Sequence, residues 1–194
     1  MMQASNPVDL FGRWYAQARR SGIEKPHAMA LSTTGQDGRP SSRMVLLSSF
    51  DENGFVFHTN GESRKAQDIA HQSWVALLFW WDELRYQVRI EGRAGKTLPE
   101  EADAYFRQRP RGSQLGAWVS EQSRVVAGRE VLEARMASVS AKFAGQEIPR
   151  PPHWGGYRID PQVFEFWQEG EDRLHERVRF QRREGEWLRE CLAP

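Results

Sequence analysis

The sequence predicts an α+β protein in which an antiparallel β-barrel carries helices at its periphery. Alternating strand patterns between residues 28 and 59 are separated by tight turns rich in Gly, Asn and Asp, as in an antiparallel meander. Further strand patterns lie between residues 156 and 191, where they can return to the same sheet. Helical patterns flank both groups of strands and would cover the sheet.

The first half of the chain contains a helix and the meander. Asn6 and Pro7 open an amphipathic helix that stops at Gly22, because Asn is a favoured N-cap, Pro suits the first turn and Gly ends helices. Ser63 is expected to cap a short helix that runs to about His71. Strands are expected at residues 28–34, 41–50, 55–59, 74–81 and 86–97, with turns at 35–38 and 51–54.

The second half contains helices followed by strands. Pro99 opens a helix that Pro110 interrupts, and residues 127–143 form the longest helical pattern of the chain. The proline-rich residues 149–152 form a stiff connector. Strands are then expected at residues 156–159, 163–168, 174–181 and 187–191. Neither a repeat nor a strong boundary divides the chain, so residues 1–194 are expected to form a single domain.

The composition excludes several classes of protein. Hydrophobic residues make up 39% and charged residues 27% of the 194 residues, which is typical of soluble globular proteins. No apolar stretch approaches the roughly 20 residues of a membrane helix, and no signal-peptide pattern is present, so we expect a cytoplasmic protein that binds no membrane. The net charge of +1, with both signs interspersed, argues against nucleic-acid binding. Cys191 is the one cysteine, so we expect neither a disulfide nor a metal site.

The residues that could carry chemistry are cations and hydroxyls at strand ends and turns. The dinucleotide-binding, Walker, nucleophile-elbow and His-Glu-x-x-His motifs are missing. Ser63-Arg64-Lys65 combines a hydroxyl, a guanidinium and an ammonium at a helix start, which is a donor set that suits a phosphate. Taken alone, Arg64 and Lys65 are more often solvated surface charges, and Arg43 and Arg109 are equally ambiguous.

A longer segment near the C-terminus is far more specific. Residues 164–177 join an aromatic strand end, a turn and the run Arg173-Leu174-His175-Glu176-Arg177. This segment resembles the C-terminal signature of the pyridoxamine 5'-phosphate oxidase family. Further matching motifs follow in order over nearly the whole chain: Arg43 to Leu47, Phe57 to Asn60, Ser63 to Lys65, Gln87-Val88, Tyr105-Phe106, Arg109 to Trp118, Gln122-Ser123 and Pro151 to Gly156.

The resemblance implies a split β-barrel fold and a homodimer with two FMN sites at the subunit interface. The positions that match FMN contacts in the family are Arg43, Met44, Val45, Leu46, Leu47, His58, Thr59, Arg64, Lys65, Gln87, Gln122, Ser123, Trp167 and Arg177. The positions that match substrate contacts are Ser48, Tyr105, Arg109, Ser113, Arg173, Leu174 and His175. Among these, Arg173 and His175 are the expected catalytic residues.

The implied reaction is the oxidation of pyridoxamine or pyridoxine 5'-phosphate to pyridoxal 5'-phosphate, with O2 as the electron acceptor. The redox chemistry belongs to the flavin, so the protein has to bind and orient the substrate. Arg173 would hold the pyridine ring, and His175 would form a hydrogen bond or move a proton near the reacting group. The competing interpretation of His175 is a strand histidine whose ring is satisfied by a carboxylate.

The chain departs from the family pattern at three points. Ser48 stands where the family usually has a lysine, so one cation is missing from the phosphate sites. His58 replaces the usual tyrosine, although the neighbouring Thr59 is kept. The N-terminal segment that folds over the active site in many members has no counterpart in this sequence, so we expect that lid to be absent.

Two other functions remain open at this stage. A related FMN oxidase could use the same pocket for another substrate, as the phenazine-biosynthesis oxidases do. Ser48 favours this alternative. Tyr105, Arg109 and Ser113 oppose it, because they match the family positions that bind the substrate phosphate. A flavin-binding or heme-binding split-barrel protein without oxidase turnover is the third possibility.

Overall fold

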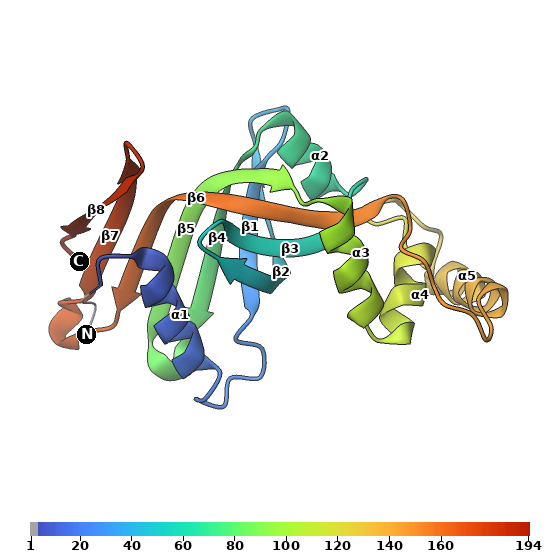
Figure 1. The fold of residues 1–194 in the computed structure, drawn as a ribbon, viewed down its shortest axis with the longest axis horizontal. Helices are drawn as coiled ribbons and strands as arrows, with labels where there is room; N and C mark the ends of the chain where they lie inside the picture. Colours follow the sequence, from blue (N-terminus) through green and yellow to red (C-terminus); the bar gives the residue numbers. More distant parts are fainter. Residues whose placement is uncertain (1–3) are drawn as a thin grey trace.

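The computed structural model describes residues 4–194 and has an antiparallel β-barrel at its centre (Figure 1). The strands follow the order β3-β2-β1-β4-β5-β6-β7-β8, and β3 also pairs with β6, which closes six strands into a barrel and leaves β7 and β8 outside it. The strands are β1 (Ala28–Thr34), β2 (Pro40–Asp51), β3 (Gly54–Asn60), β4 (Trp74–Trp81), β5 (Tyr86–Lys96), β6 (Trp154–Gln168), β7 (Glu176–Arg183) and β8 (Glu186–Cys191). The predicted α+β class and antiparallel barrel are confirmed.

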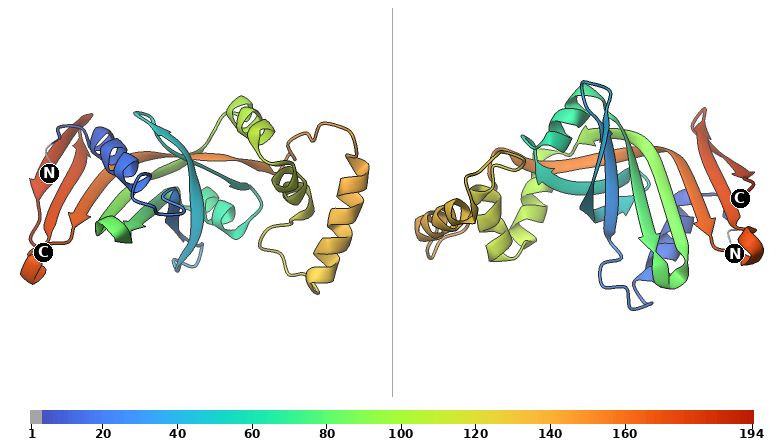
Figure 2. Two further views of the ribbon diagram at one scale, coloured as in Figure 1. Left: turned by 90° about the horizontal axis from the view of Figure 1, so that it is seen from below. Right: turned by 180° about the vertical axis from the view of Figure 1, so that it is seen from behind.

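The helices lie around the barrel rather than inside it (Figure 2). They are α1 (Pro7–Ala18), α2 (Arg64–His71), α3 (Pro99–Gln108), α4 (Arg111–Val119) and α5 (Arg129–Lys142), with 3-10 turns η1 (Asp82–Leu84) and η2 (Glu171–Arg173). None of the helices within residues 4–194 is long and apolar enough to cross a bilayer.

Strand β6 belongs to the barrel at its start and to the outer hairpin at its end. Residues 154–159 pair with β3, residues 163–168 pair with β7, and β5 pairs along nearly the whole strand. The two strands predicted at 156–159 and 163–168 are therefore one continuous strand. Pro161, which lies between the predicted segments, sits at a register shift opposite Gly92, where a missing N–H interrupts a ladder that is already irregular.

Helix α1 covers one end of the barrel with aromatic side chains. Its predicted cap is present, because Asn6 Oδ1 accepts a hydrogen bond from the Val8 amide at 2.8 Å. Phe11 is fully buried and meets the rings of Phe50, Phe55 and Phe79 edge-on, with centroids 4.9, 4.8 and 5.0 Å away. Burial of a phenylalanine of this kind contributes roughly 1.5–3 kcal/mol, so α1 is fixed to the barrel by its apolar face.

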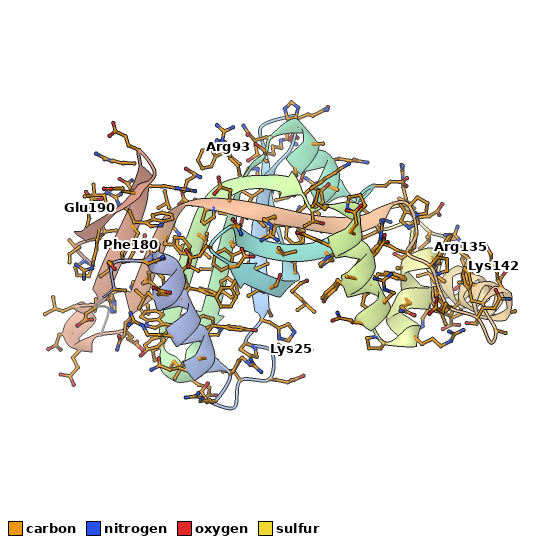
Figure 3. All side chains as sticks on the ribbon, in the orientation of Figure 1. Lys25, Arg93, Arg135, Lys142, Phe180 and Glu190 are labelled. Atoms are coloured by element: carbon orange, nitrogen blue, oxygen red, sulfur yellow. The ribbon has the colours of Figure 1, made fainter. Side chains whose placement is uncertain are left out.

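Helices α3, α4 and α5 form a second layer at the other end of β6. In Figure 3, Glu190 on β8 and Lys142 on α5 lie at opposite ends of the molecule. A separate apolar cluster holds this layer, and it contains Phe106, Leu115, Ala117, Phe143, Ile148 and Trp154. The predicted interruption at Pro110 is where α3 ends and α4 begins, since proline cannot continue a helix but suits the start of one.

Two local predictions need correction. Ser63 occupies the N-cap position of α2, but its hydroxyl donates to the Asn60 carbonyl at 2.7 Å instead of capping the helix. The Ser123 hydroxyl accepts from the Arg64 amide at 3.2 Å in its place. The strand predicted from residue 174 begins at Glu176, because η2 occupies the preceding residues.

Candidate active site

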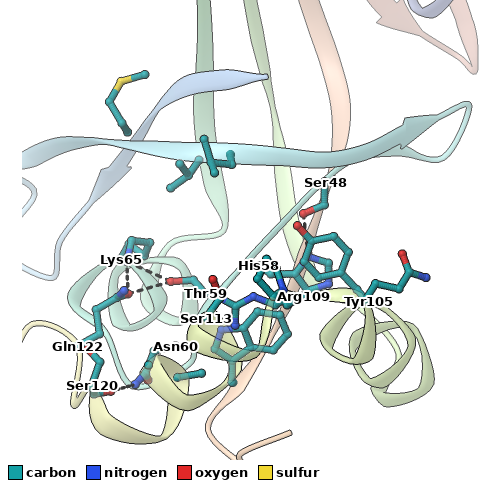
Figure 4. A pocket seen from close by; sticks show the side chains of 18 residues that line it. Ser48, His58, Thr59, Asn60, Lys65, Tyr105, Arg109, Ser113, Ser120 and Gln122 are labelled. Atoms are coloured by element: carbon teal, nitrogen blue, oxygen red, sulfur yellow. Dashed lines mark hydrogen bonds between the residues drawn. The ribbon is translucent and has the colours of Figure 1, made fainter. Parts of the chain in front are cut away.

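A cavity of about 710 Å³ lies where the open face of β2 and β3 meets α2, α3 and α4 (Figure 4). Its lining contains two cations, Lys65 and Arg109, and no aspartate or glutamate. The lining residues are Met44, Val45, Leu46, Ser48, His58, Thr59, Asn60, Lys65, Tyr105, Gln108, Arg109, Pro110, Ser113, Gly116, Ala117, Ser120, Gln122 and Trp154. This charge balance suits an anionic ligand.

Lys65 is a buried ammonium that contacts neutral oxygens. Its side chain comes from the first turn of α2, and the residue is 8% exposed. The Nζ atom donates to Gln122 Oε1 at 2.6 Å, to Thr59 Oγ1 at 3.1 Å and to Ser63 Oγ at 3.2 Å. Burial, and then the nearby Arg43 guanidinium, lower the pKa of Lys65 to about 8. A buried cation without a carboxylate partner is costly, so this position suits a bound anion.

Arg43 lies behind this position and does not line the cavity. Its guanidinium donates to Thr33 Oγ1 at 2.7 Å and to Ser41 Oγ at 2.6 Å, and it lies 3.5 Å from Asp68. Burial is the main cause that lowers the pKa of Arg43. Arg43 therefore adds positive potential from the side while its own hydrogen bonds are met by the protein.

Arg109 stands at the opposite side of the cavity from Lys65 (Figure 4). Its guanidinium lies over the indole of Trp154, 4.7 Å from the ring centroid, and this contact holds the planar group in place. Within residues 4–194 the buried Nη1 atom has no hydrogen-bond partner. Burial lowers the pKa of Arg109, yet a guanidinium remains protonated at any physiological pH. A buried donor of this kind calls for an acceptor from a ligand.

His58 and Ser48 lie beside Arg109 on adjacent strands. The Ser48 hydroxyl is 2.8 Å from His58 Nδ1. The imidazole is stacked on Tyr105 of α3, with ring centroids 4.0 Å apart and planes 2° apart. Burial and the neighbouring Arg109 lower the pKa of His58 to about 4, so this ring is neutral at physiological pH.

A second group of predicted residues lies at the far end of the sheet. We name it the C-terminal cluster and define it as Gln87, Trp167, Arg173, Leu174, His175 and Arg177. Gln87, Trp167 and Arg177 are neighbours in one row across β5, β6 and β7. None of the six lines the cavity, and Figure 1 places η2 and β7 at the opposite end of the molecule from α3 and α4.

The turn before β7 presents its side chains to solvent in a constrained backbone. Asp172 and Arg173 both have positive φ angles, 51° and 64°, which non-glycine residues seldom adopt. Leu174 is 72% exposed. The imidazole of His175 lies 4.6 Å from the Trp167 ring, and its Nδ1 accepts from the Gly170 amide at 3.3 Å, so a neutral His175 carries its proton on Nε2.

Arg177 is held by protein groups at the edge of the same cluster. Its Nε and Nη2 donate to Glu165 Oε1 at 3.1 and 2.9 Å, and its Nη1 donates to the Ala193 carbonyl at 2.8 Å. These bonds tie the end of the chain to β6 and β7. Among residues 4–194 the ring of His175 has no hydrogen bond to a carboxylate, and a backbone amide occupies its Nδ1, so the predicted alternative of a carboxylate partner is not observed there.

The cavity gathers half of the predicted site residues. Predicted residues that line it are Met44, Val45, Leu46, Ser48, His58, Thr59, Lys65, Tyr105, Arg109, Ser113 and Gln122. Arg64 is exposed outside it, and Ser123 is joined to it through the Arg64 amide. Leu47 is buried and packs in the main apolar core.

Seven of the lining residues were not predicted as individual site residues, and two of these seven, Asn60 and Trp154, shape the site directly. Trp154 provides the face under Arg109, and its position just before Gly155 and Gly156 at a strand start was the available signal. Asn60 donates to the Ser120 carbonyl at 3.1 Å and accepts from the Glu62 amide at 2.7 Å. It thereby fixes the loop that carries Gln122 into the cavity.

Comparison with protein families divides the chain at the α5–β6 connection. Residues 16–143 match the model described as pyridoxamine 5'-phosphate oxidase. Residues 154–194 match the model described as the pyridoxine 5'-phosphate oxidase C-terminal dimerisation region, which includes five of the six residues of the C-terminal cluster.

Full-length relatives carry the same description. The pyridoxine/pyridoxamine 5'-phosphate oxidase of Acaryochloris marina is 50% identical over 98% of this chain and 87% of its own. The protein of that name from Rubrobacter xylanophilus is 53% identical, with 97% and 87% covered. The solved structure of PhzG from Burkholderia lata, in complex with tetrahydrophenazine-1-carboxylic acid, is 36% identical, with a TM-score of 0.94 over 98% of this chain and 94% of that one. The chain therefore belongs to the pyridoxamine 5'-phosphate oxidase family.

Proposed function

We propose that this protein is an FMN-dependent oxidase that converts pyridoxamine or pyridoxine 5'-phosphate to pyridoxal 5'-phosphate. The observation that carries the proposal is the cavity, which contains no carboxylate. It holds the buried Lys65, whose partners are neutral, and the half-buried Arg109, whose Nη1 atom has no partner within the described residues. The identity of about half of all residues to named oxidases over nearly the full chain supports the substrate class.

The Lys65 side of the cavity has the donors that an FMN phosphate requires. Lys65, Thr59 and Gln122 are already joined by hydrogen bonds, and Lys65 lies in the first turn of α2, where a helix favours negative charge. Met44, Val45 and Leu46 offer an apolar wall beside them. When bound, FMN would accept a hydride equivalent from the substrate and pass the electrons to O2.

The Arg109 side has the donors for a second phosphate, that of the substrate. Arg109 contributes the guanidinium with the unpaired Nη1, and Tyr105, Ser113 and Ser48 contribute hydroxyls from α3, α4 and β2. Charge-assisted hydrogen bonds of this kind are about twice as strong as neutral ones. They would hold the substrate by a group remote from the reacting carbon.

The proposed catalytic residues Arg173 and His175 would come from a second copy of the chain. They lie outside the cavity of their own chain, on the segment that matches a dimerisation region. In this homodimer each site combines one cavity with the partner's C-terminal cluster. Arg173 would orient the substrate ring, and His175, with its proton on Nε2 when neutral, would donate a hydrogen bond near the reacting group.

An exposed apolar face supports the homodimer. Met44, Leu46 and Trp80 are 63%, 50% and 47% exposed, and Met44 and Leu78 are the two cross-strand partners of Ala30 on either side of β1. A continuous apolar face of this kind on β2, β1 and β4 is typical of a subunit interface. It adjoins the β2 wall of the cavity, so a partner seated there would meet the site.

The second candidate function is oxidation of a phenazine precursor in the same pocket. The TM-score of 0.94 to PhzG favours it, as does Ser48 in the place of a family lysine. Its substrate would be held as a carboxylate rather than as a phosphate ester. The higher identity to the pyridoxine/pyridoxamine oxidases makes this the weaker candidate.

Anaerobic reduction of the bound flavin separates these functions. We expect pyridoxamine 5'-phosphate to bleach the flavin absorbance of the FMN-loaded protein within seconds, whereas tetrahydrophenazine-1-carboxylic acid leaves it oxidised. A flavin that the phenazine precursor reduces and pyridoxamine 5'-phosphate does not would favour the second candidate. A flavin that neither compound reduces would identify a binding protein without this oxidase activity.

A further inference from the structure

The pair Ser48 and His58 occupies the wall of the cavity that adjoins Arg109. Ser48 Oγ and His58 Nδ1 are 2.8 Å apart, and both residues line the cavity. The Tyr105 ring is parallel to the imidazole at 4.0 Å, and the Trp154 ring is within 9° of parallel at 5.1 Å. These ring contacts fix the orientation of His58, so the line between its Nδ1 and Ser48 Oγ is fixed too, whichever of the two atoms donates.

His58 can donate one hydrogen bond and accept one. Its lowered pKa, about 4, leaves the ring neutral, and a neutral imidazole has one N–H and one bare nitrogen. If Nδ1 is bare, the Ser48 hydrogen points at the ring and only lone pairs face the cavity. If Nδ1 carries the proton, Ser48 accepts from His58 and its own hydrogen is free for a ligand.

The surroundings of the other ring nitrogen favour the second arrangement. Within the described residues, the buried His58 Nε2 and the buried Thr97 Oγ1 both have no hydrogen-bond partner. A side chain at Gly156 would lie 2.6 Å from Thr97 Oγ1 and 3.0 Å from His58 Nε2, so both atoms border the same small space. A proton on Nε2 would be a buried donor without an acceptor, whereas a proton on Nδ1 can be donated to Ser48 Oγ, so Nδ1 is the favoured position of the proton.

An anion in the cavity selects the same arrangement. A phosphate oxygen accepts hydrogen bonds and repels lone pairs, so it is compatible with a Ser48 hydroxyl that points toward it. A hydroxyl that accepts one hydrogen bond becomes a better donor in the next, because linked hydrogen bonds polarise one another. Arg109 lies close enough to His58 to lower its pKa, which places the charged and the neutral donors around one position.

We propose that His58 is a positioning residue that turns the Ser48 hydroxyl toward the substrate phosphate, and that this pair determines the preference for phosphorylated over unphosphorylated substrate. The proposal rests on the proposed function, in which this side of the cavity holds the substrate phosphate. It assigns to two neutral residues the place for which the sequence pattern of the family has a cation. His58 has no contact with the reacting carbon in this account and acts through Ser48.

The test compares two ligands on the FMN-loaded protein, 4-deoxypyridoxine 5'-phosphate and 4-deoxypyridoxine, neither of which can be oxidised at the missing group. Calorimetry gives the Kd of each ligand, and the ratio followed here is the Kd of 4-deoxypyridoxine divided by the Kd of its 5'-phosphate. Loss of a hydrogen bond to a charged group corresponds to about a tenfold change or more, so Ser48→Ala and His58→Phe should each lower the ratio about tenfold. The double variant should lose no more than either single variant, because both changes break one connection.

Conservative variants are the matched controls. Ser48→Thr keeps the hydroxyl, and His58→Asn keeps a side-chain N–H near the position of Nδ1, so both should retain the ratio within about threefold. His58→Phe keeps a ring against Tyr105, and its FMN content and melting temperature show whether the cavity wall is intact. A purely structural role for His58 would weaken both ligands alike and leave the ratio unchanged.

The outcomes separate this proposal from the proposed function. An unchanged ratio in His58→Phe, or no preference for the phosphate ester in the parent protein, overturns the role of the pair. Turnover of pyridoxamine 5'-phosphate by the parent protein with an unchanged ratio in both variants keeps the oxidase and rejects the pair. A lowered ratio in both variants, in a protein that fails to oxidise pyridoxamine 5'-phosphate, supports the pair and rejects the oxidase.

Discussion

Lys65 is a buried cation whose hydrogen-bond partners in the structure are all neutral. The residue is 8% exposed, and its ammonium contacts Thr59, Ser63 and Gln122, all neutral. Without a ligand, burial favours the loss of the ammonium proton and lowers the pKa of Lys65 to about 8. A phosphate beside Lys65 has the opposite effect, because an anion stabilises the charged form. Protonation of Lys65 and binding of FMN are therefore linked.

The linkage gives FMN binding a defined dependence on pH. Below about pH 8 Lys65 is charged and attracts the phosphate, whereas above it the free protein loses that proton and must regain it on binding. We expect the FMN affinity to fall as the pH rises from 8 to 9.5, by up to about tenfold per pH unit. Quenching of flavin fluorescence in titrations of the apoprotein measures the Kd at each pH.

Lys65→Arg is the control for this dependence. A guanidinium stays charged over the whole range, so its Kd should be nearly constant between pH 8 and 9.5. A parent protein whose Kd is also constant would contradict the assignment of Lys65 to the phosphate.

Motifs selected residues that the structure brings together, whereas residues that act through packing alone were not selected; the roles of all of them stay predictions. Lys65, Thr59 and Gln122 meet in the structure although 57 positions separate Lys65 from Gln122 along the chain, and the family motifs were sufficient to select them. Trp154 and Thr97 matter through a ring face and a buried hydroxyl. Such roles depend on three-dimensional neighbours, and no local pattern of the sequence reports them.

At the scale of elements, β6 is where local patterns were least informative. The sequence has Pro161 and Gln162 between two apolar alternations, and a break is the natural interpretation. The strand continues because β5 keeps pairing on both sides of the irregularity: the register shifts between Glu91 and Gly92, which leaves one residue of β6 unpaired. Only a partner strand about 70 positions earlier can reveal this, so tertiary pairing overrides the local signal.

Gly92 is the residue that permits this register shift. A Cβ at Gly92 would lie 2.2 Å from the Asp160 carbonyl oxygen, which is backbone and cannot rotate away. Gly92→Ala should therefore force β5 and β6 apart and lower the free energy of unfolding by about 1–3 kcal/mol. Urea unfolding followed by circular dichroism gives this value.

Gly95→Ala in the same strand is the matched control. Nothing lies within 4 Å of a Cβ at Gly95, so its effect should stay within about 0.5 kcal/mol. Equal losses in the two variants would mean that glycine is needed for general strand flexibility and not for the close approach to Asp160.

At the scale of the whole molecule, the predicted site is divided between two ends of one chain. The cavity holds Lys65 and Arg109, while Arg173 and His175 lie on the turn before β7. The sequence order of the motifs could not show this division, because motifs state which residues act together and not which chain each comes from. The single domain predicted for residues 1–194 stays a prediction, whereas the strands of both halves do join one sheet.

The division is testable with a mixed dimer of two defective chains. Arg109→Ala disables the cavity and Arg173→Ala disables the C-terminal cluster, so each homodimer has two damaged sites. In the mixed dimer both changes fall into one site, and the other site is intact. We expect the purified mixed dimer to recover about half of the parent activity per dimer, since a two-fold symmetric dimer has two equal sites.

The same experiment identifies a site built within one chain. In that case each chain of the mixed dimer would carry one damaged site, and mixing would restore nothing. Differently tagged chains, purified in two affinity steps and assayed with pyridoxamine 5'-phosphate, distinguish the two results. Two Arg109→Ala chains combined through the same procedure provide the baseline.

The position of β6 in the chain also has a consequence for synthesis on the ribosome. The barrel closes when residues 154–159 pair with β3, whose strand begins at Gly54, so about 100 residues must be translated between the two partners. Until then β3 and β5 both present an open hydrogen-bonding edge to solvent, of the kind on which nascent chains aggregate. Nascent chains should therefore be most prone to aggregate when translation pauses before Trp154. Chaperone binding to nascent chains should end soon after β6 has left the exit tunnel.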